Sequence, residues 1–246
     1  MKRLENKVAL VTGGGRGMGA NITKRLAAEG AAVVITYSKS AEQSEKIAAQ
    51  INAAGGRALA LKADNALPQE VAGAVGKTIA EFGHIDILVN NAGIYIGKAF
   101  EEHTMEDYEE VMAVNVRAVY AAALAAVKHI PSGGRIITIG SNMADNATGP
   151  NATLYAMSKS ALNGFTKGLA RDLGPKDITV NLVQPGPIDT DMNPANTELA
   201  DFLRSRMALR EYGSGDDVAG LVAFLASEEG KYITGTALTI DGGFNA

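Results

Sequence analysis

Seven short runs of aliphatic and β-branched residues recur along the chain, and segments with helical spacing of apolar residues lie between them. Several runs, such as Val8-Ala9-Leu10-Val11, are apolar at every position. Strands with two apolar faces are typical of a parallel sheet that is covered by helices on both sides. The runs are residues 8–12, 32–36, 57–62, 86–90, 135–140, 179–183 and 237–240. The pattern predicts an α/β fold of the doubly wound type, with seven parallel strands flanked by helices on both faces.

The domain organisation follows from length and from the absence of linkers in the sequence. The chain has 246 residues, of which 46% are hydrophobic, which is enough for one large core. No internal repeat, low-complexity tract or linker rich in Pro and Ser marks a boundary, so we expect one domain over residues 1–246. An irregular, proline-containing stretch follows the sixth run and leads into an amphipathic segment at 199–207. Because α/β sheets bind ligands beyond the carboxyl ends of their strands, we predict a substrate loop at about 187–211.

Composition argues against several classes of function. The formal net charge is −4 and the basic residues are dispersed, which does not favour a nucleic-acid partner. There is no cysteine, and His84, His103 and His129 lack ligand spacing, so no metal site is expected. We expect each histidine to be exposed or hydrogen-bonded. With no apolar stretch of about 18 residues and no signal-like N-terminus, we predict a cytoplasmic protein without a membrane partner.

A glycine-rich turn follows the first predicted strand. The sequence there is Thr12-Gly13-Gly14-Gly15-Arg16-Gly17-Met18-Gly19, and helical periodicity begins with Ile22. Glycines between a first strand and a first helix allow the backbone to approach a pyrophosphate, whose charge the amides and dipole of the helix stabilise. A simple loop is the alternative, but the position favours a dinucleotide site. The predicted contacts are Gly13, Gly15, Arg16, Gly17, Met18 and Gly19.

The end of the second predicted strand indicates which dinucleotide is bound. An NAD-preferring site places Asp or Glu there, whereas this chain reads Tyr37-Ser38-Lys39-Ser40. Arg16 and Lys39 would neutralise a 2′-phosphate, the serines would donate hydrogen bonds to it, and Ser40 also suits the cap of the next helix. We therefore predict NADP(H) as the preferred cofactor, and NAD(H) stays open. The alternative is that Arg16 and Lys39 are solvated surface cations.

Tyr155 and Lys159 lie one helical turn apart in the segment Tyr155-Ala156-Met157-Ser158-Lys159. A phenol with a pKa of about 10 exchanges protons poorly at neutral pH, but an ammonium group at i+4 favours the phenolate and lowers that pKa. The spacing is also common on solvated helix faces. It indicates an acid–base pair only in combination with other motifs.

Those other motifs are present, and together they resemble the short-chain dehydrogenase/reductase family along the whole chain. They are Thr12-Gly13-x3-Gly17-x-Gly19, Asp64, Asn90-Asn91-Ala92-Gly93, Asn115, Ser141, Tyr155-x3-Lys159 and Pro185-Gly186. The resemblance implies a Rossmann-type domain and a catalytic tetrad of Asn115, Ser141, Tyr155 and Lys159. Taken alone, Ser141 would be read as a cap or turn residue and Asn115 as a kink or surface residue.

The resemblance also implies further cofactor contacts and a reaction. Its cofactor contacts are Asp64 and Asn65 at the adenine end, Asn91, Ala92 and Gly93 along the sheet, Tyr155 and Lys159 at the ribose, and Pro185, Gly186, Ile188 and Thr190 at the nicotinamide end. It implies an NADPH-dependent reductase that acts on a carbonyl group. Ser141 would hydrogen-bond the carbonyl oxygen, Tyr155 would protonate it, Lys159 would lower the pKa of Tyr155, and Asn115 would position a water for proton resupply.

The candidate substrate wall is largely apolar. It has no clear cationic clamp, which favours a neutral ketone, aldehyde or secondary alcohol as a small-molecule partner. Its predicted members are Ile94, Tyr95, Ser141, Asn142, Met143, Tyr155, Met192, Leu199 and Phe202. The apolar members also suit a protein core. Many family members with this pattern are labelled 3-oxoacyl-carrier-protein reductases, and Arg204, Arg206 and Arg210 offer the basic patch that a carrier protein would need.

Two further expectations come from the resemblance. Family members are usually homotetramers, and the matching interface segments are 106–130, 155–173 and 216–246. Their alanine-rich composition equally suits an internal core. Residues 133–141 and 184–196 also resemble a bacterial family member associated with biofilm dispersal through binding of cyclic di-GMP, so a nucleotide-binding regulator is the alternative function. The intact tetrad favours the enzyme.

Overall fold

The computed structural model describes residues 2–147 and 149–246 and confirms the predicted fold class. Seven parallel strands form one sheet in the order β3-β2-β1-β4-β5-β6-β7. The strands are β1 (Val8–Val11), β2 (Ala32–Tyr37), β3 (Arg57–Lys62), β4 (Ile87–Asn90), β5 (Arg135–Ile139), β6 (Thr179–Pro185) and β7 (Ala237–Ile240). The ends of the strands differ from the predicted runs by at most two residues. The largest difference is in β6, which extends two residues beyond its predicted run because Gln184 and Pro185 pair with β7.

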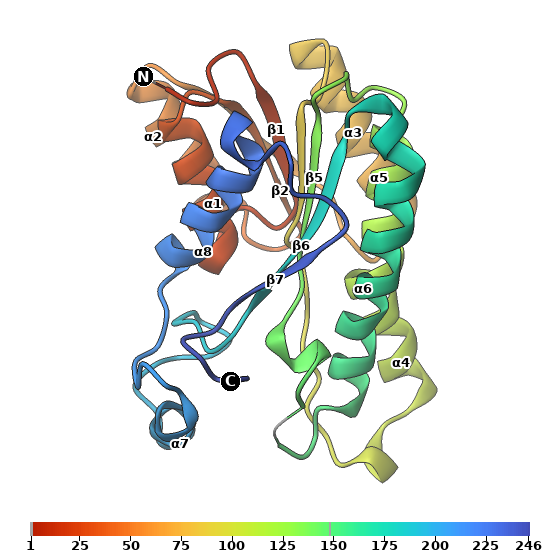
Figure 1. Cartoon of the computed structure of the whole chain (residues 1–246). Helices are drawn as coiled ribbons and strands as arrows, with labels where there is room; N and C mark the ends of the chain where they lie inside the picture. The colour runs from red at the N-terminus through yellow and green to blue at the C-terminus, as the bar shows by residue number, and fades with distance from the viewer. Residues whose placement is uncertain (1, 148) are drawn as a thin grey trace.

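Helices cover both faces of the sheet (Figure 1). On one face lie α1 (Gly17–Ala28), α2 (Ala41–Ala53) and α8 (Gly215–Ala226), and on the other lie α3 (Pro68–Phe82), α5 (Ala118–Ala126) and α6 (Thr153–Leu173). Each face has its own core, in which α1 and α8 pack on β1, β4, β5 and β6, and α3, α5 and α6 pack on the opposite side. Side chains such as Leu26 and Ile137 are fully buried, so a truncation of either to Ala would cost about 2–5 kcal/mol.

The predicted helical segment at 106–130 is interrupted. It starts as α4 (Met105–Met112), widens into a π-helical turn, η2 (Ala113–Arg117), and continues as α5. The Thr104 and Asp107 side chains form a capping box at the start of α4. A π turn inserts an extra residue and is often found at functional sites. Here it contains Asn115, whose side chain is only 1% exposed.

The segment after β6 forms a loop and a short helix. Ile188 bridges to Gly213, and Thr190 pairs with Asn193 across a tight turn. The amphipathic stretch predicted at 199–207 is α7 (Glu198–Arg206), which begins where the Thr197 side chain accepts a hydrogen bond from Ala200 N. In Figure 1 α7 and the C-terminus lie at the same end of the molecule.

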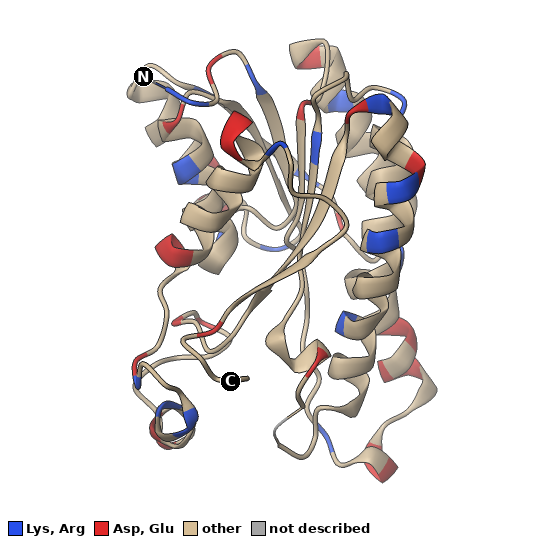
Figure 2. Cartoon of the chain, viewed as in Figure 1, with Lys and Arg blue, Asp and Glu red and all other residues tan. Residues whose placement is uncertain are grey.

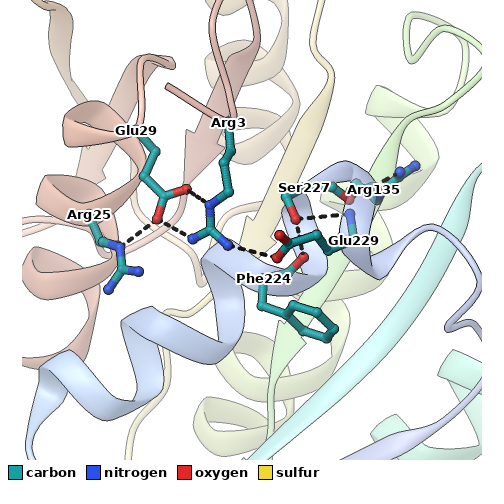
Figure 3. Close-up of polar contacts among 7 residues, drawn as sticks. All are labelled: Arg3, Arg25, Glu29, Arg135, Phe224, Ser227 and Glu229. Atoms are coloured by element: carbon teal, nitrogen blue, oxygen red, sulfur yellow. Dashed lines mark hydrogen bonds and ion pairs between the residues drawn. The ribbon is translucent and has the colours of Figure 1, made fainter. Parts of the chain in front are cut away.

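A polar network ties the N-terminal segment to α1 and to the end of α8 (Figure 3). The Arg3 guanidinium donates to Glu29 at 2.7 Å and to Glu229 at 3.0 Å, and Arg25 donates to Glu29 at 2.6 Å. Arg135 is buried at the start of β5 and donates to the carbonyl oxygens of Gly133 and Ser227. These contacts hold the amino ends of the strands, away from the site described below.

Charges of both signs are spread over the outer helices, and few lie on the strands (Figure 2). Among the residues that the structure describes, no helix is long and apolar enough to cross a membrane, and no group of three His, Asp or Glu side chains could hold a metal ion.

The histidine prediction is wrong for His103. Both of its ring nitrogens are buried and have no hydrogen-bond partner among residues 2–147 and 149–246. The nearby Asp107 carboxylate, 3.7 Å away, is already held by Lys98 at 2.7 Å and by the backbone amide of Thr104 at 2.9 Å. His84, in contrast, lies 2.9 Å from the Asp86 carboxylate.

Candidate active site

A cavity of about 570 Å³ opens where the glycine-rich turn, the ends of β2, β3, β4 and β5, α6 and the loop after β6 meet. Most of the predicted cofactor residues line it. These are Gly13, Arg16, Gly17, Met18, Gly19, Tyr37, Ser38, Lys39, Ser40, Asp64, Asn65, Asn91, Ala92, Gly93, Tyr155, Lys159 and Thr190, and the predicted substrate residue Met192 joins them. The sequence prediction therefore identified one continuous cavity from residues that are far apart in the chain.

The glycine-rich turn is held in place by the end of β4. The Asn91 side-chain amide donates to the carbonyl oxygens of Thr12 at 3.0 Å and Gly13 at 3.1 Å, and the Thr12 hydroxyl accepts from the amides of Asn91 and Ala92. A Cβ atom on Gly19 would overlap the carbonyl oxygen of Gly13. The first residues of α1 have no side-chain cap, so their amides are available to an anion. This cradle fits a pyrophosphate.

The adenosine end of the cavity carries cations and hydroxyls. Arg16, Ser38, Lys39 and Ser40 line it together with Gln43. Ser40 is the N-cap residue of α2, as predicted, but its hydroxyl makes no cap hydrogen bond. This group is therefore free to bind a phosphate oxygen. The residues present fit a 2′-phosphate.

Asp64 lies in a fixed turn after β3. Its carboxylate accepts from Ala66 N at 2.9 Å, and its own amide donates to Glu70 at 2.8 Å. Such a turn presents the Asp64 side chain to the cavity in one orientation, as an adenine contact would require.

Four predicted residues lie behind the cavity wall. Gly15 packs against Ser44 of α2, where a Cβ atom would collide with the hydroxyl. Pro185 ends β6, Gly186 packs against Asp241, and Ile188 belongs to the core. Their roles at the cofactor stay predictions.

The structure brings the four tetrad residues together around α6. Lys159 is 3% exposed, its Nζ donates to the carbonyl oxygen of Ile139 at 3.0 Å, and it lies 5.7 Å from the centroid of the Tyr155 ring. The Asn115 side-chain amide donates to the Ser158 hydroxyl at 3.0 Å, and that hydroxyl donates to the Tyr155 carbonyl oxygen at 2.7 Å. Hydrogen bonds therefore link the π turn to the helix that carries the Tyr155 and Lys159 pair.

Asn115 also clamps the loop after β4. Its Oδ1 accepts from Ile94 N at 2.9 Å, and its Nδ2 donates to Ile94 O at 3.0 Å. A Cβ atom on Gly93 would lie 3.3 Å from Lys159 Nζ and 3.5 Å from Asn115 Oδ1. A glycine at position 93 therefore leaves room for Lys159 and Asn115 to approach the loop.

The acidity of the tyrosine differs from the sequence-based expectation. Burial raises the pKa of Tyr155 to about 12, and a hydrogen bond with Ser141 offsets this only in part. Burial lowers the pKa of Lys159 to about 8. The pKa of Tyr155 is thus raised overall and not lowered as the spacing to Lys159 predicted, because loss of hydration of the phenolate is the largest effect. A phenol with a raised pKa stays protonated at neutral pH, which is the state that a proton donor needs.

Ser141 follows β5 directly and is 7% exposed. It is the N-cap of a short 3-10 helix, η3 (Asn142–Ala144), and its hydroxyl accepts from Met143 N at 3.2 Å. The same hydroxyl is the group whose hydrogen bond acts on the pKa of Tyr155. Ser141 therefore fills both roles that the sequence allowed, a cap residue and a neighbour of Tyr155.

The candidate substrate wall is made by separate loops. The Tyr95 ring meets Tyr155 edge-on with a centroid distance of 5.2 Å, and Met192 is 52% exposed beside the cavity. Met143 is partly buried in η3. Tyr95, Ser141 and Met143 are not on the wall of the large cavity, but Tyr95 and Ser141 contact its Tyr155 side.

Sequence reasoning missed several residues of the cavity wall. Gln43, Ala66, Glu110, Val114, Ile139 and Gly140 are among them, whereas Ile94, a predicted wall residue, does line the cavity. Ala66 and Gly140 directly adjoin residues that were predicted, and Gln43 follows Ser40 by one helical turn. Helical spacing and chain proximity could have found these. Val114 lies in the π turn, which has no clear sequence signal, and Glu110 lies in α4 directly before it.

Comparison with known proteins adds to this geometry. Residues 13–245 match a family model described as Enoyl-(Acyl carrier protein) reductase. A short chain dehydrogenase from Burkholderia cenocepacia J2315, solved in complex with NADP, is 55% identical with a TM-score of 0.98, over 99% of this chain and 100% of the other. A blue fluorescent protein from a metagenomic library, solved in complex with NADPH, is 50% identical with a TM-score of 0.98 and the same coverage. The cyclic-di-GMP-binding biofilm dispersal mediator protein of Escherichia coli (strain K12) is 42% identical over 100% of both chains.

Proposed function

This chain belongs to the short-chain dehydrogenase/reductase family of oxidoreductases, and from its site we propose that it is an NADPH-dependent reductase of a carbonyl group in a neutral, partly apolar small molecule. One observation carries the proposal. The partly exposed Tyr155, with Lys159 and Ser141 beside it, lies in the same cavity that Arg16 and Lys39 line at its other end.

The preference for NADP(H) is supported by the charge of the adenosine end. Arg16 and Lys39 provide two cations there, and Ser38 and Ser40 provide hydroxyl donors. Related structures contain NADP or NADPH. When bound, NADPH supplies a hydride to the carbonyl carbon.

The tetrad residues would handle the charge and the proton. Ser141 donates a hydrogen bond to the carbonyl oxygen, on which negative charge develops, and Tyr155 transfers its phenolic proton to that oxygen. Lys159, protonated at neutral pH because its pKa is about 8, stabilises the tyrosinate that remains. Asn115 holds the loop after β4 against α6, the helix that carries Tyr155 and Lys159. A water beside this segment would resupply the proton.

The substrate class is supported by the residues near Tyr155. Tyr95 and Met192 are large, apolar and exposed there, and we assign them together with Ser141 and Met143 to the substrate site, to which the loop 187–211 contributes Met192. Arg204, one of the three candidate docking arginines, is already bound to Asp201 at 2.7 Å and lies over the Tyr212 ring. This weakens the case for a carrier-protein substrate.

The experiment is a panel of carbonyl compounds assayed by NADPH oxidation. It includes aryl ketones, diketones, sugars and β-ketoacyl thioesters, each with NADPH and with NADH. We expect turnover with neutral ketones and a higher kcat/KM with NADPH. No oxidation with any compound, or a kcat/KM for NADH that equals that for NADPH, would contradict the proposal.

A second candidate function rests on the full-length similarity to the cyclic-di-GMP-binding biofilm dispersal mediator protein. Under this alternative the chain binds a cyclic dinucleotide and acts as a regulator. Calorimetric titration with cyclic di-GMP and, separately, with NADPH distinguishes the two. Binding of NADPH without heat from cyclic di-GMP favours the enzyme, and the reverse result favours the regulator.

We also propose a homotetramer. Tyr120 and Leu124 on α5 and Met157 on α6 are large apolar side chains that are 59%, 56% and 44% exposed, as expected of helices that pair with a second copy. Light scattering on the purified chain tests this, since a monomer at micromolar concentration would contradict it.

A further inference from the structure

The C-terminal tail lies beside the segment that follows β5. In Figure 1 the C-terminus lies between α7 and the green turn at the end of β5. Two asparagine side chains make the contact: Asn142 Nδ2 donates to Asn245 Oδ1 at 3.2 Å, and Asn245 Nδ2 donates to the Asn142 carbonyl oxygen at 3.0 Å. Asn142 is 4% exposed, so this reciprocal pair is largely shielded from water.

The tail is shaped to reach this position. The Asp241 carboxylate accepts from the amides of Gly243 at 2.9 Å and Asn245 at 3.0 Å, which bends the chain after β7. Gly243 has a φ of 77°, a left-handed conformation that glycine adopts without strain. Asp241 packs closely against Gly186, because a Cβ atom on Gly186 would overlap the Asp241 side chain. The turn thus places Asn245 next to Asn142 through contacts that do not involve the Asn245 side chain.

The Asn142 carbonyl oxygen accepts several hydrogen bonds that order the segment after Ser141. It accepts from the amides of Asp145 and Asn146, both at 3.1 Å, in addition to Asn245 Nδ2. Ser141 is the preceding residue, and its hydroxyl is held by Met143 N. Because Asn142 is bonded directly to Ser141 and the Ser141 hydroxyl is held by the next residue, Met143, a shift of this segment would change the position of that hydroxyl.

We propose that Asn245 is a positioning residue for the reaction: through its reciprocal pair with Asn142, the C-terminal tail fixes the Ser141 hydroxyl at the carbonyl oxygen of the substrate. This inference rests on the proposed function for its kinetic consequence. The structural part, in which the tail orders the segment after β5, holds for the protein with or without a substrate.

The test compares Asn245→Ala with Asn52→Ala. Asn52 is a matched control, because its side chain also makes two hydrogen bonds to the backbone, with Ala58 N at 2.7 Å and Ala58 O at 3.0 Å, in an exposed region outside the cavity wall. We expect kcat to fall about five- to tenfold in Asn245→Ala, with an unchanged KM for NADPH, because a misplaced catalytic group slows turnover without weakening cofactor binding. Asn52→Ala keeps the wild-type kcat.

Two further readouts separate positioning from general stability. If Asn245 acts only through Ser141, the double variant Ser141→Ala/Asn245→Ala has the same kcat as Ser141→Ala alone. Hydrogen–deuterium exchange of residues 141–147 becomes faster in Asn245→Ala and not in Asn52→Ala.

The inference is overturned by wild-type kcat in Asn245→Ala, by equal losses in Asn52→Ala, or by additive losses in the double variant. If no carbonyl compound is reduced by the wild-type chain, the proposed function fails. The exchange measurement then still tests whether the tail orders the segment after β5. Unchanged exchange of residues 141–147 in Asn245→Ala would refute that role.

Discussion

The Tyr95 ring meets the Tyr155 ring edge-on, with centroids 5.2 Å apart and planes at 79°. The Tyr95 hydroxyl donates to the carbonyl oxygen of Asn151 at 3.1 Å, which joins the loop after β4 to the segment before α6. Gly97 makes this geometry possible, because a Cβ atom there would lie 2.6 Å from Tyr95 Cε1 and 2.7 Å from its hydroxyl. The Tyr95 ring thus packs against the proposed proton donor, and the absence of a side chain at Gly97 leaves room for this ring.

Gly97→Ala is expected to displace Tyr95 and to lower kcat/KM by about tenfold, with the KM for NADPH unchanged. Burial is the largest cause of the raised pKa of Tyr155, and the nearby Tyr95 adds to it, so displacement of the Tyr95 ring lowers that pKa and moves the alkaline limb of the reduction profile to lower pH. The pH dependence of kcat/KM measures both effects.

Gly76→Ala is the control for this variant. Gly76 lies within α3, and a Cβ atom there meets no atom within 4 Å, so alanine should keep full activity and stabilise the helix by about 0.5–1 kcal/mol. A pH profile for Gly97→Ala that matches the wild-type profile would show that Tyr95 does not act on Tyr155.

Removal of either cation at the adenosine end should change the choice of cofactor. A charge-assisted hydrogen bond contributes about 1.5–3 kcal/mol, so Arg16→Ala or Lys39→Ala should raise the KM for NADPH about 10- to 100-fold. The KM for NADH should not change. Lys24→Ala, an exposed cation of α1 outside the cavity wall, is the control. An unchanged ratio of kcat/KM for the two cofactors in both variants would mean that Arg16 and Lys39 are solvated surface groups.

The sheet was predictable because each strand carries its own local signal. All seven apolar runs became strands, and the glycine-rich turn followed from the order of strand, glycines and helix. The π turn at Asn115 was not predictable, since it depends on how α4 and α5 pack against α6. The raised pKa of Tyr155 was missed for a related reason: helical spacing placed Lys159 near the ring, but burial is a property of the whole site.

The tail contact and the Tyr95 contact were missed because they join distant segments. Asn142 and Asn245 are 103 residues apart in the chain, and no periodicity relates them. Tyr95 was predicted as part of the substrate wall, yet its edge-on contact with Tyr155 depends on Gly97 and Asn151, which carried no motif.

Burial of Lys159 should make stability depend on pH. Its pKa falls from 10.5 to about 8 in the folded protein, so below pH 8 both states keep the proton and the folded state carries the full cost of a buried charge. Between pH 8 and 10 the unfolded chain binds more protons, and the stability contributed by this group increases with pH. Lys159→Met removes this dependence. Thermal melts should therefore show the wild-type Tm rising relative to that of Lys159→Met from pH 8 to 10, and a constant difference in Tm would contradict the assignment.

The central claim is that Tyr155 donates the proton in an NADPH-dependent carbonyl reduction. The most direct measurement is the rate of NADPH oxidation by wild type and Tyr155→Phe with the best ketone of the panel, together with the Kd for NADPH by calorimetry. General acid catalysis contributes about 10²- to 10⁴-fold, so kcat should fall by that factor in Tyr155→Phe while the Kd stays within about twofold of wild type. Near wild-type turnover in Tyr155→Phe would contradict the account.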